Sequence, residues 1–235
     1  MKVIVTIIIV LSSLQALAQL KNDAYREEIR SILMKNHHPI SDWHEAKEEI
    51  FQYVDLKKDE NGYFVRDVYC GEIIRKGIGV DSMPNNNKVN VEHTWPQSKF
   101  PTRGSITQKA DIHHLYPTNS KANSKRGNFP FGNFQNGEAL AECPLSKMGY
   151  VPDARVDGFE PPLSQKGNTA RSLFYFSVRY NIEIPDYEEI VLRQWHLLDP
   201  VDQEEIERNN RIEKVQGNRN IFVDEPELTD IISNF

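Results

Sequence analysis

Hydrophobic residues recur with a helical period near the start of the chain and again in its last third. Residues 23–35 and 43–54 place apolar side chains three or four positions apart, which is typical of amphipathic helices. Residues 168–180 carry a broader apolar face, so we expect this helix to lie in the core. Further helical patterns cover residues 190–198 and 201–215. Both ends of the chain are therefore predicted to be mainly helical.

The middle of the chain favours strands. Residues 89–95 alternate between apolar and polar side chains, and residues 112–116 predict a second short strand that Pro117 ends. A helix capped by Thr118 or Asn119 follows. The local order is therefore strand, loop, strand and helix.

Two neighbouring regions are less regular. Residues 63–74 are rich in Tyr, Phe, Val and Ile, which predicts a strand. Residues 128–160 contain several glycines and prolines without a clear period, so they give no prediction.

The first eighteen residues have the pattern of a secretory signal peptide. Lys2 precedes an apolar run, and Ala16-Leu17-Ala18 offers small residues for cleavage. The apolar run is shorter than the roughly 20 residues that a membrane-spanning helix needs, which argues against an anchor. We predict that residues 1–18 are removed and that residues 19–235 form a single domain, secreted or periplasmic, with no membrane association and no stable protein partner.

Two cysteines, Cys70 and Cys143, remain in the exported chain. An oxidising compartment favours a disulfide between them. Two unpaired thiols are the alternative, because the sequence does not give the distance between them.

The charge of the chain is unevenly distributed. Without residues 1–18 the chain has 27 basic and 34 acidic residues, a net charge of −7, which argues against a polyanion bound over the whole surface. Residues 99–128 are the exception, with six basic residues against Asp111, or +5 locally. The six are Lys99, Arg103, Lys109, Lys121, Lys125 and Arg126. A solvated helix face accounts for Lys121 and Lys125, but not for the scarcity of acids.

Glu92, His93 and Asn123 supply the groups that phosphodiester hydrolysis requires. A histidine with an ordinary pKa near 6.5 is largely neutral at pH 7 and can take a proton from water. Carboxylate and amide oxygens are the ligands that Mg²⁺ and Ca²⁺ prefer. Successive strand residues point to opposite faces, so Glu92 and His93 are expected to have separate roles, one toward a metal and one toward the attacking water.

Zinc bound by His93, His113 and His114 is the competing interpretation. His113 and His114 are adjacent on a predicted strand and would face opposite ways, which makes a shared ion difficult. At least one of them is expected to support the site, and Asp111 to hold a neighbouring side chain by a hydrogen bond.

Several segments resemble the endonuclease I family of secreted bacterial nucleases, which carry a ββα-metal (His-Me finger) motif. The most specific are VEHTWP at 91–96, ADIHHLYPT at 110–118 and NSKRGNFPFG at 123–132. ARSLFY at 170–175, WHLLDPV at 195–201 and QGNRN at 216–220 also look like this family. The resemblance therefore covers nearly all of residues 19–235.

The resemblance implies an α+β fold, mainly helical, in a single domain around the ββα-metal motif. It implies that His93 is the general base and that Glu92 and Asn123 bind one Mg²⁺, with Ca²⁺ or Mn²⁺ as substitutes. Arg103, the only arginine in the loop between the two strands, is expected to contact the scissile phosphate. A further set is assigned to supporting the site or binding substrate: Asp111, His113, His114, Lys125, Arg126 and Asn128.

The expected activity is cleavage of DNA, and of RNA, with little sequence preference, through contacts to backbone phosphates. Two alternatives belong to other classes. One is a non-catalytic nucleic-acid-binding protein that keeps the fold, and the other is a zinc hydrolase that acts on peptides or esters. The intact set of Glu92, His93 and Asn123 argues against a binder, which does not need a water-activating base.

Overall fold

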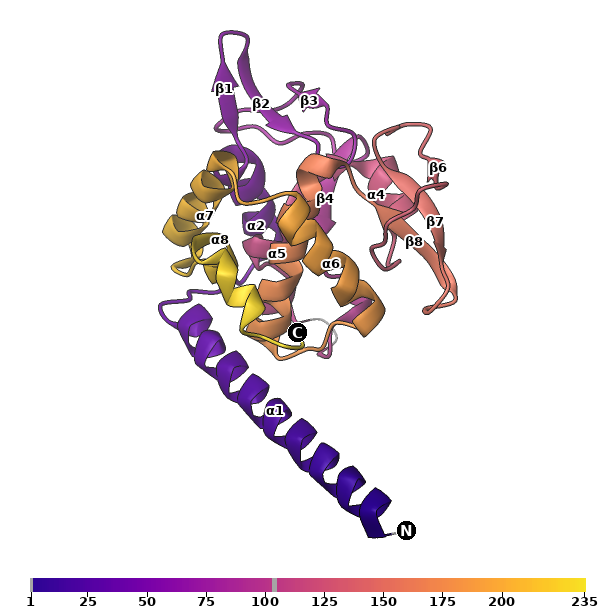
Figure 1. The fold of residues 1–235 in the computed structure, drawn as a ribbon. Helices are drawn as coiled ribbons and strands as arrows, with labels where there is room; N and C mark the ends of the chain where they lie inside the picture. Colours follow the sequence, from indigo (N-terminus) through magenta and orange to yellow (C-terminus); the bar gives the residue numbers. More distant parts are fainter. Residues whose placement is uncertain (1, 103–104) are drawn as a thin grey trace.

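The computed structural model describes residues 2–102 and 105–235, with side chains from residue 18 onward. A long helix, α1 (Lys2–Met34), extends from the body, so that the N-terminus lies far from the C-terminus (Figure 1). The helical backbone at residues 2–18 does not test the signal-peptide prediction. Within the described residues, no helix has both the length and the apolar character that crossing a membrane requires.

The body mixes helices with three small antiparallel sheets, which makes the fold α+β. Its helices are α2 (Trp43–Glu49), α3 (Ile106–Lys109), α4 (Ser120–Arg126), α5 (Leu163–Tyr180), α6 (Asp186–Leu198), α7 (Gln203–Gln216) and α8 (Ile221–Asp224). Its strands are β1 (Lys57–Asp59), β2 (Gly62–Arg66), β3 (Ile73–Ile74), β4 (Val89–His93), β5 (Leu115–Asn119), β6 (Glu138–Ala139), β7 (Lys147–Val151) and β8 (Val156–Glu160). The 3₁₀ turns are η2 (Gln97–Lys99), η3 (Ile112–His114) and η4 (Pro226–Asp230), and η1 (Ile50–Val54) is a π-helical turn.

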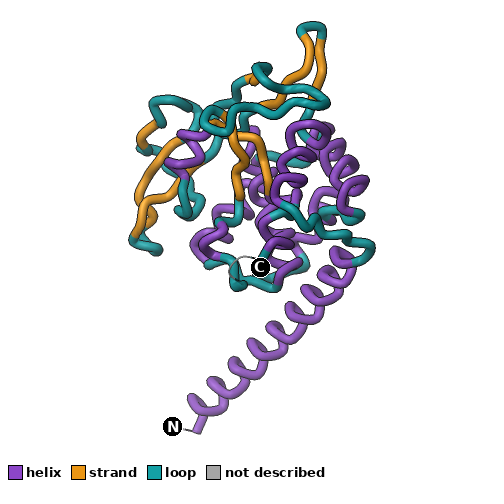
Figure 2. Tube along the Cα trace, turned by 180° about the vertical axis from the view of Figure 1, so that it is seen from behind, coloured by secondary structure: helices purple, strands orange, loops and turns teal. Residues whose placement is uncertain are grey.

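Helix α5 lies at the centre and packs against α1, α6 and η3. Its buried aromatic residues form a core with neighbouring elements, in which Phe174 stacks on Phe235 and Phe131 packs edge-on against Trp195. A second core lies between η1 and the β4–β5 hairpin, and includes Phe51 and Leu115. In the body, α7–α8 and the β6–β7–β8 sheet lie at opposite edges (Figures 1 and 2).

The helices predicted by periodicity are confirmed. The pattern at residues 23–35 lies within α1, and the pattern at 43–54 becomes α2 followed by η1. The central helix begins at Leu163, five residues before its predicted start, because residues 164–167 are polar or glycine and carry none of the apolar pattern.

The prediction of a strand at residues 112–116 ended by Pro117 is wrong at both ends. Residues 112–114 form η3, because the carboxylate of Asp111 accepts the backbone N–H of His113 and caps the turn. Strand β5 then runs through Pro117 to Asn119. The Pro117 carbonyl accepts the N–H of Val68, so this part of its backbone faces away from β4 and the missing N–H costs the hairpin nothing.

Two other stretches also differ from the sequence reading. The strand predicted at 63–74 is two strands, β2 and β3, separated by a turn in which Asp67 accepts the N–H groups of Tyr69 and Cys70. The unassigned residues 128–160 contain β6, β7 and β8. The predicted disulfide is confirmed, since Cys70 and Cys143 are bonded.

Candidate active site

The β4–β5 hairpin and α4 form one unit that carries Glu92, His93 and Asn123. Glu92 lies opposite Tyr116 and His93 opposite Leu115 in the hairpin. Asn119 caps α4 by accepting two backbone N–H groups, and the helix ends at Gly127 (φ +54°). The elements therefore follow in the order strand, strand, helix, as predicted.

Asn123 ties the helix to the first strand. Its Nδ2 donates to the Oδ1 of Asn90 at 2.9 Å and to the Val91 carbonyl at 3.1 Å. Both amide hydrogens are used in this way, which fixes the orientation of the amide. Within residues 2–102 and 105–235, no group donates a hydrogen bond to Asn123 Oδ1, so this oxygen is free to bind a cation.

Glu92 is almost fully buried, with 1% of its surface exposed. Its Oε1 accepts the hydroxyl of Tyr69 at 2.7 Å and lies 3.3 Å from Nε of Arg126. Burial raises the pKa of Glu92, while Arg126 and Tyr69 act in the opposite direction. No side chain in the described part of the protein donates to Oε2. Oε2 and the oxygen of Asn123 are the kind of donors that a hard divalent cation binds, so these residues fit Mg²⁺.

Arg126 is 1% exposed, and its side chain contacts β4 instead of the solvent. Its guanidinium donates to the carbonyls of His93 at 3.2 Å and Thr94 at 2.6 Å, and lies over the ring of Phe131. Arg126 was counted in the local charge of +5, but its pairing with Glu92 and its burial remove it from the surface that a polyanion would meet. Of the two predicted roles, the structure favours support.

His93 is 7% exposed and lies between two rings. The Trp43 ring centroid is 5.0 Å away, and that of His114 is 5.3 Å away at a steep angle. Its Nε2 is 3.0 Å from the Lys109 carbonyl. A carbonyl can only accept, so Nε2 carries the hydrogen and Nδ1 has the lone pair. Burial lowers the pKa of His93 well below its ordinary value, and His114 adds to this effect, so the ring is neutral at pH 7.

His113 and His114 lie behind the hairpin on η3 and are both buried. His113 Nε2 contacts the Asn218 carbonyl at 3.3 Å, and His114 Nε2 contacts the Gln108 carbonyl at 2.7 Å. Burial lowers the pKa of each ring to about 4. The alternating strand from which their separation was inferred is wrong, because η3 is a helical turn. The two rings nevertheless have different neighbours, since His113 packs against Tyr175 and His114 against Phe176. In each ring, Nε2 is hydrogen-bonded to a backbone carbonyl.

Asp111 joins three elements, α5, α7 and η3. Its carboxylate accepts the hydroxyls of Tyr175 at 2.9 Å and Tyr180 at 2.8 Å and the amide of Gln216 at 2.9 Å, besides capping η3. Burial alone would raise the pKa of Asp111, but the neighbouring histidines lower it to about 2. The prediction that Asp111 holds a neighbouring side chain is confirmed.

Two further candidates lie toward the surface. Lys125 and Asn128 are exposed at the end of α4, where Asn128 Nδ2 donates to Ser98 Oγ at 3.3 Å. Lys125 lines an open groove with Lys121, Ser124 and Asn90, next to Asn123. Arg103 lies outside the described residues.

Comparison with known proteins identifies the family of the chain. The Endonuclease I family profile matches residues 13–227, which include the whole hairpin and α4. The chain belongs to the Endonuclease I family.

Three relatives show how far the similarity extends. An extracellular ribonuclease of Bacillus subtilis is 39% identical over 61% of this chain and 53% of its own length. Endonuclease-1 of Buchnera aphidicola (subsp. Acyrthosiphon pisum) is 31% identical over 72% of this chain and 76% of its own. An extracellular deoxyribonuclease of Aeromonas hydrophila is 31% identical over 49% of each. The match spans about half the length of the extracellular ribonucleases.

Sequence reasoning missed several side chains around the site of this Endonuclease I family member. Tyr69 donates to Glu92, Trp43 packs on His93, Asn90 holds Asn123, and Gln97 contacts His93. Asn90 had a local signal, since it lies two residues before Glu92 on the same strand face. Tyr69 and Trp43 come from distant segments and had none.

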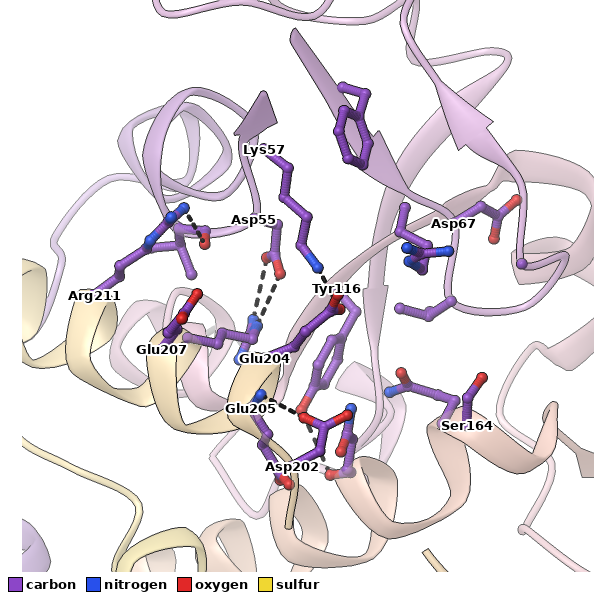
Figure 3. A pocket seen from close by; sticks show the side chains of 18 of the residues that line it. Asp55, Lys57, Asp67, Tyr116, Ser164, Asp202, Glu204, Glu205, Glu207 and Arg211 are labelled. Atoms are coloured by element: carbon purple, nitrogen blue, oxygen red, sulfur yellow. Dashed lines mark hydrogen bonds and ion pairs between the residues drawn. The ribbon is translucent and has the colours of Figure 1, made fainter. Parts of the chain in front are cut away.

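A separate cavity of the Endonuclease I family member lies elsewhere. It has a volume of about 580 Å³ and lies between β1–β2 and the start of α7 (Figure 3). Two ion pairs lie in its wall, Lys57 with Glu204 and Asp55 with Arg208. It contains none of Glu92, His93 or Asn123, so it is not the candidate active site.

Proposed function

We propose that this protein is an exported, Mg²⁺-dependent endonuclease that cleaves DNA and RNA with little sequence preference. The observation that carries the proposal is the fixed tautomer of His93. Its hydrogen bond to the Lys109 carbonyl leaves Nδ1 unprotonated, and the lowered pKa keeps the ring neutral. The names of the relatives, extracellular ribonuclease and extracellular deoxyribonuclease, support the substrate class.

Glu92 Oε2 and Asn123 Oδ1 are proposed to hold one Mg²⁺, for which Ca²⁺ or Mn²⁺ could substitute. When bound, such a cation stabilises negative charge on the phosphate and on the leaving oxygen. The Tyr69 hydroxyl and Arg126 orient Glu92 for this role, and Asn90 orients Asn123.

His93 Nδ1 is proposed to take a proton from the attacking water. The ring is held by Trp43 and His114, so it needs no rearrangement before the transfer. Arg103 is proposed to contact the scissile phosphate, and Lys125 and Asn128 to contact neighbouring phosphates. Contacts to phosphates carry no direct sequence information, which accounts for the proposed lack of sequence preference.

We further propose that residues 1–18 are a cleaved signal peptide and that residues 19–235 act as one nuclease domain in the periplasm or the medium, without a stable protein partner. The disulfide between Cys70 and Cys143 suits an oxidising compartment.

The decisive experiment incubates the purified protein with plasmid DNA and, separately, with an RNA transcript. Cleavage is expected in Mg²⁺ and is expected to stop in EDTA and in His93→Ala. Cleavage that persists in EDTA would rule out the metal-dependent mechanism. A gel shift without product at every Mg²⁺ concentration would favour a non-catalytic binder, and stoichiometric zinc in the purified protein would favour the zinc hydrolase.

A further inference from the structure

The nitrogen that His93 would use as a base is already occupied. Gln97 Nε2 lies 3.3 Å from His93 Nδ1. Because Nε2 of His93 donates to the Lys109 carbonyl, Nδ1 is an acceptor and the Gln97 amide must be the donor. A water molecule cannot donate to Nδ1 along the same direction while this hydrogen bond persists.

Gln97 is not needed to hold the ring. His93 is already fixed by the Lys109 carbonyl and by the rings of Trp43 and His114. Gln97 itself is exposed. Within the described residues, its side chain makes one hydrogen bond, to His93 Nδ1. An exposed amide at the open side of the base is therefore placed where substrate would arrive.

The backbone that carries Gln97 is anchored on both sides. Trp95 and Phe100 flank η2, and both stack on Phe176, with ring centroids 5.1 Å and 5.6 Å apart. Within the turn, the N–H of Lys99 donates to the Pro96 carbonyl at 2.9 Å. The amide of Gln97 can therefore change partner by side-chain rotation alone.

We propose that Gln97 caps the base in the free enzyme and transfers its hydrogen bond to a non-bridging phosphate oxygen of the substrate, which uncovers Nδ1 for the attacking water. A hydrogen bond to a charged phosphate oxygen is stronger than one to a neutral imidazole nitrogen, so the substrate itself drives the exchange. The inference rests on the proposed function and adds to it a substrate-contacting residue.

Three substitutions distinguish this role from packing. Gln97→Met keeps the length of the side chain but cannot donate, and it should lower kcat/KM about 10- to 100-fold, as expected for a lost hydrogen bond to a charged group. Gln97→Glu should lower kcat/KM about tenfold further, because a carboxylate repels the phosphate. Gln203→Glu is the control: it makes the same change at an exposed position about 20 Å along α7 from Gln216, the residue that contacts Asp111.

A second measurement does not depend on cleavage. In ¹⁵N spectra of the metal-free protein, the His93 Nδ1 resonance should shift in Gln97→Met while that of Nε2 stays in place. Adding a short single-stranded DNA oligonucleotide in EDTA should move Nδ1 of the wild type in the same direction.

The outcomes separate the two proposals. If the wild type cleaves and Gln97→Met has wild-type or higher kcat/KM, the role of Gln97 is overturned and the nuclease assignment stands. Equal losses in Gln97→Met and Gln97→Glu would overturn the phosphate contact. If the wild type cleaves neither DNA nor RNA, the proposed function fails, and an unchanged Nδ1 resonance in Gln97→Met would separately refute the cap.

Discussion

The two faces of β4 give the adjacent residues Glu92 and His93 different electrostatic surroundings. On one face, Glu92 is buried beside the cation of Arg126 and the hydroxyl of Tyr69. On the other, His93 is buried between the rings of Trp43 and His114. Burial disfavours the charged form of both groups. Arg126 opposes this effect for Glu92, whereas His114 reinforces it for His93.

The difference suits the two proposed roles. A carboxylate binds a cation best in its charged form, and a histidine takes a proton in its neutral form. Adjacent residues can have such different environments because side chains alternate across a strand and each face packs against different elements. The predictions below test each face, beginning with the largest expected effect.

Acid should lower the free energy of unfolding through the buried, neutral side chains of His113 and His114. Burial lowers the pKa of His113 and of His114 from 6.5 to about 4 in the folded protein. Since the unfolded chain binds these protons more readily, their full contribution to stability is present above pH 6.5 and is lost as the pH falls to 4. The loss is about 3 kcal/mol for each histidine, a large share of a typical domain's stability.

Urea unfolding at a series of pH values measures this loss. A free energy of unfolding that stays constant between pH 6.5 and pH 4 would contradict it. His44→Ala is the control, because it removes an exposed histidine instead of a buried one.

His93→Ala should abolish most of the activity without affecting the other face. Loss of a general base lowers turnover by about 10³-fold. Titration calorimetry with Mn²⁺ should give the wild-type affinity, because Glu92 and Asn123 are unchanged. An equal loss of metal affinity would place His93 among the metal ligands and break the division between the two faces.

Arg126→Met should destabilise the protein by about 3 kcal/mol, because it leaves the Glu92 carboxylate buried without its cation. The change also removes the donors to the His93 and Thr94 carbonyls. Lys125→Met, one residue earlier on the exposed side of α4, is the matched control and should change the free energy of unfolding by less than about 0.5 kcal/mol. Similar values for the two variants would refute the supporting role of Arg126.

Tyr69→Phe should have the smallest effect, about a tenfold loss of Mn²⁺ affinity, since the hydroxyl orients Glu92. Tyr180→Phe removes a hydroxyl from Asp111, on the other side of the site, and should leave the metal affinity unchanged. Calorimetry on both variants tests whether the two hydroxyls serve separate faces.

Much of the fold could be predicted from local patterns. Amphipathic periodicity located the segments that became α1, α2, α5, α6 and α7, because each buries a regular face. The β6–β7–β8 sheet was missed because most residues of β7 and β8 are at least partly exposed, so no apolar alternation marks them. The sequence predicts a strand end at Pro117 because it does not show which side of a strand faces a partner.

The candidate site was only partly predictable. Glu92, His93 and Asn123 could be proposed from residue chemistry and a family resemblance. The tertiary fold was needed to bring Tyr69, Trp43 and Gln97 to them. It was also needed to show that Arg126, which a charge count assigns to the surface, is buried against Glu92. Sequence gives the reacting groups, whereas their partners depend on packing between distant segments.

The hydrogen bond between His93 and the Lys109 carbonyl has a consequence for mutational robustness. The acceptor is a main-chain atom, so every amino acid at position 109 supplies it. Substitutions at position 109 should therefore not change which nitrogen of His93 carries the hydrogen. That depends on the path of the backbone at the end of α3. Insertions or deletions between α3 and η3 are the changes to which the chemistry should be most vulnerable.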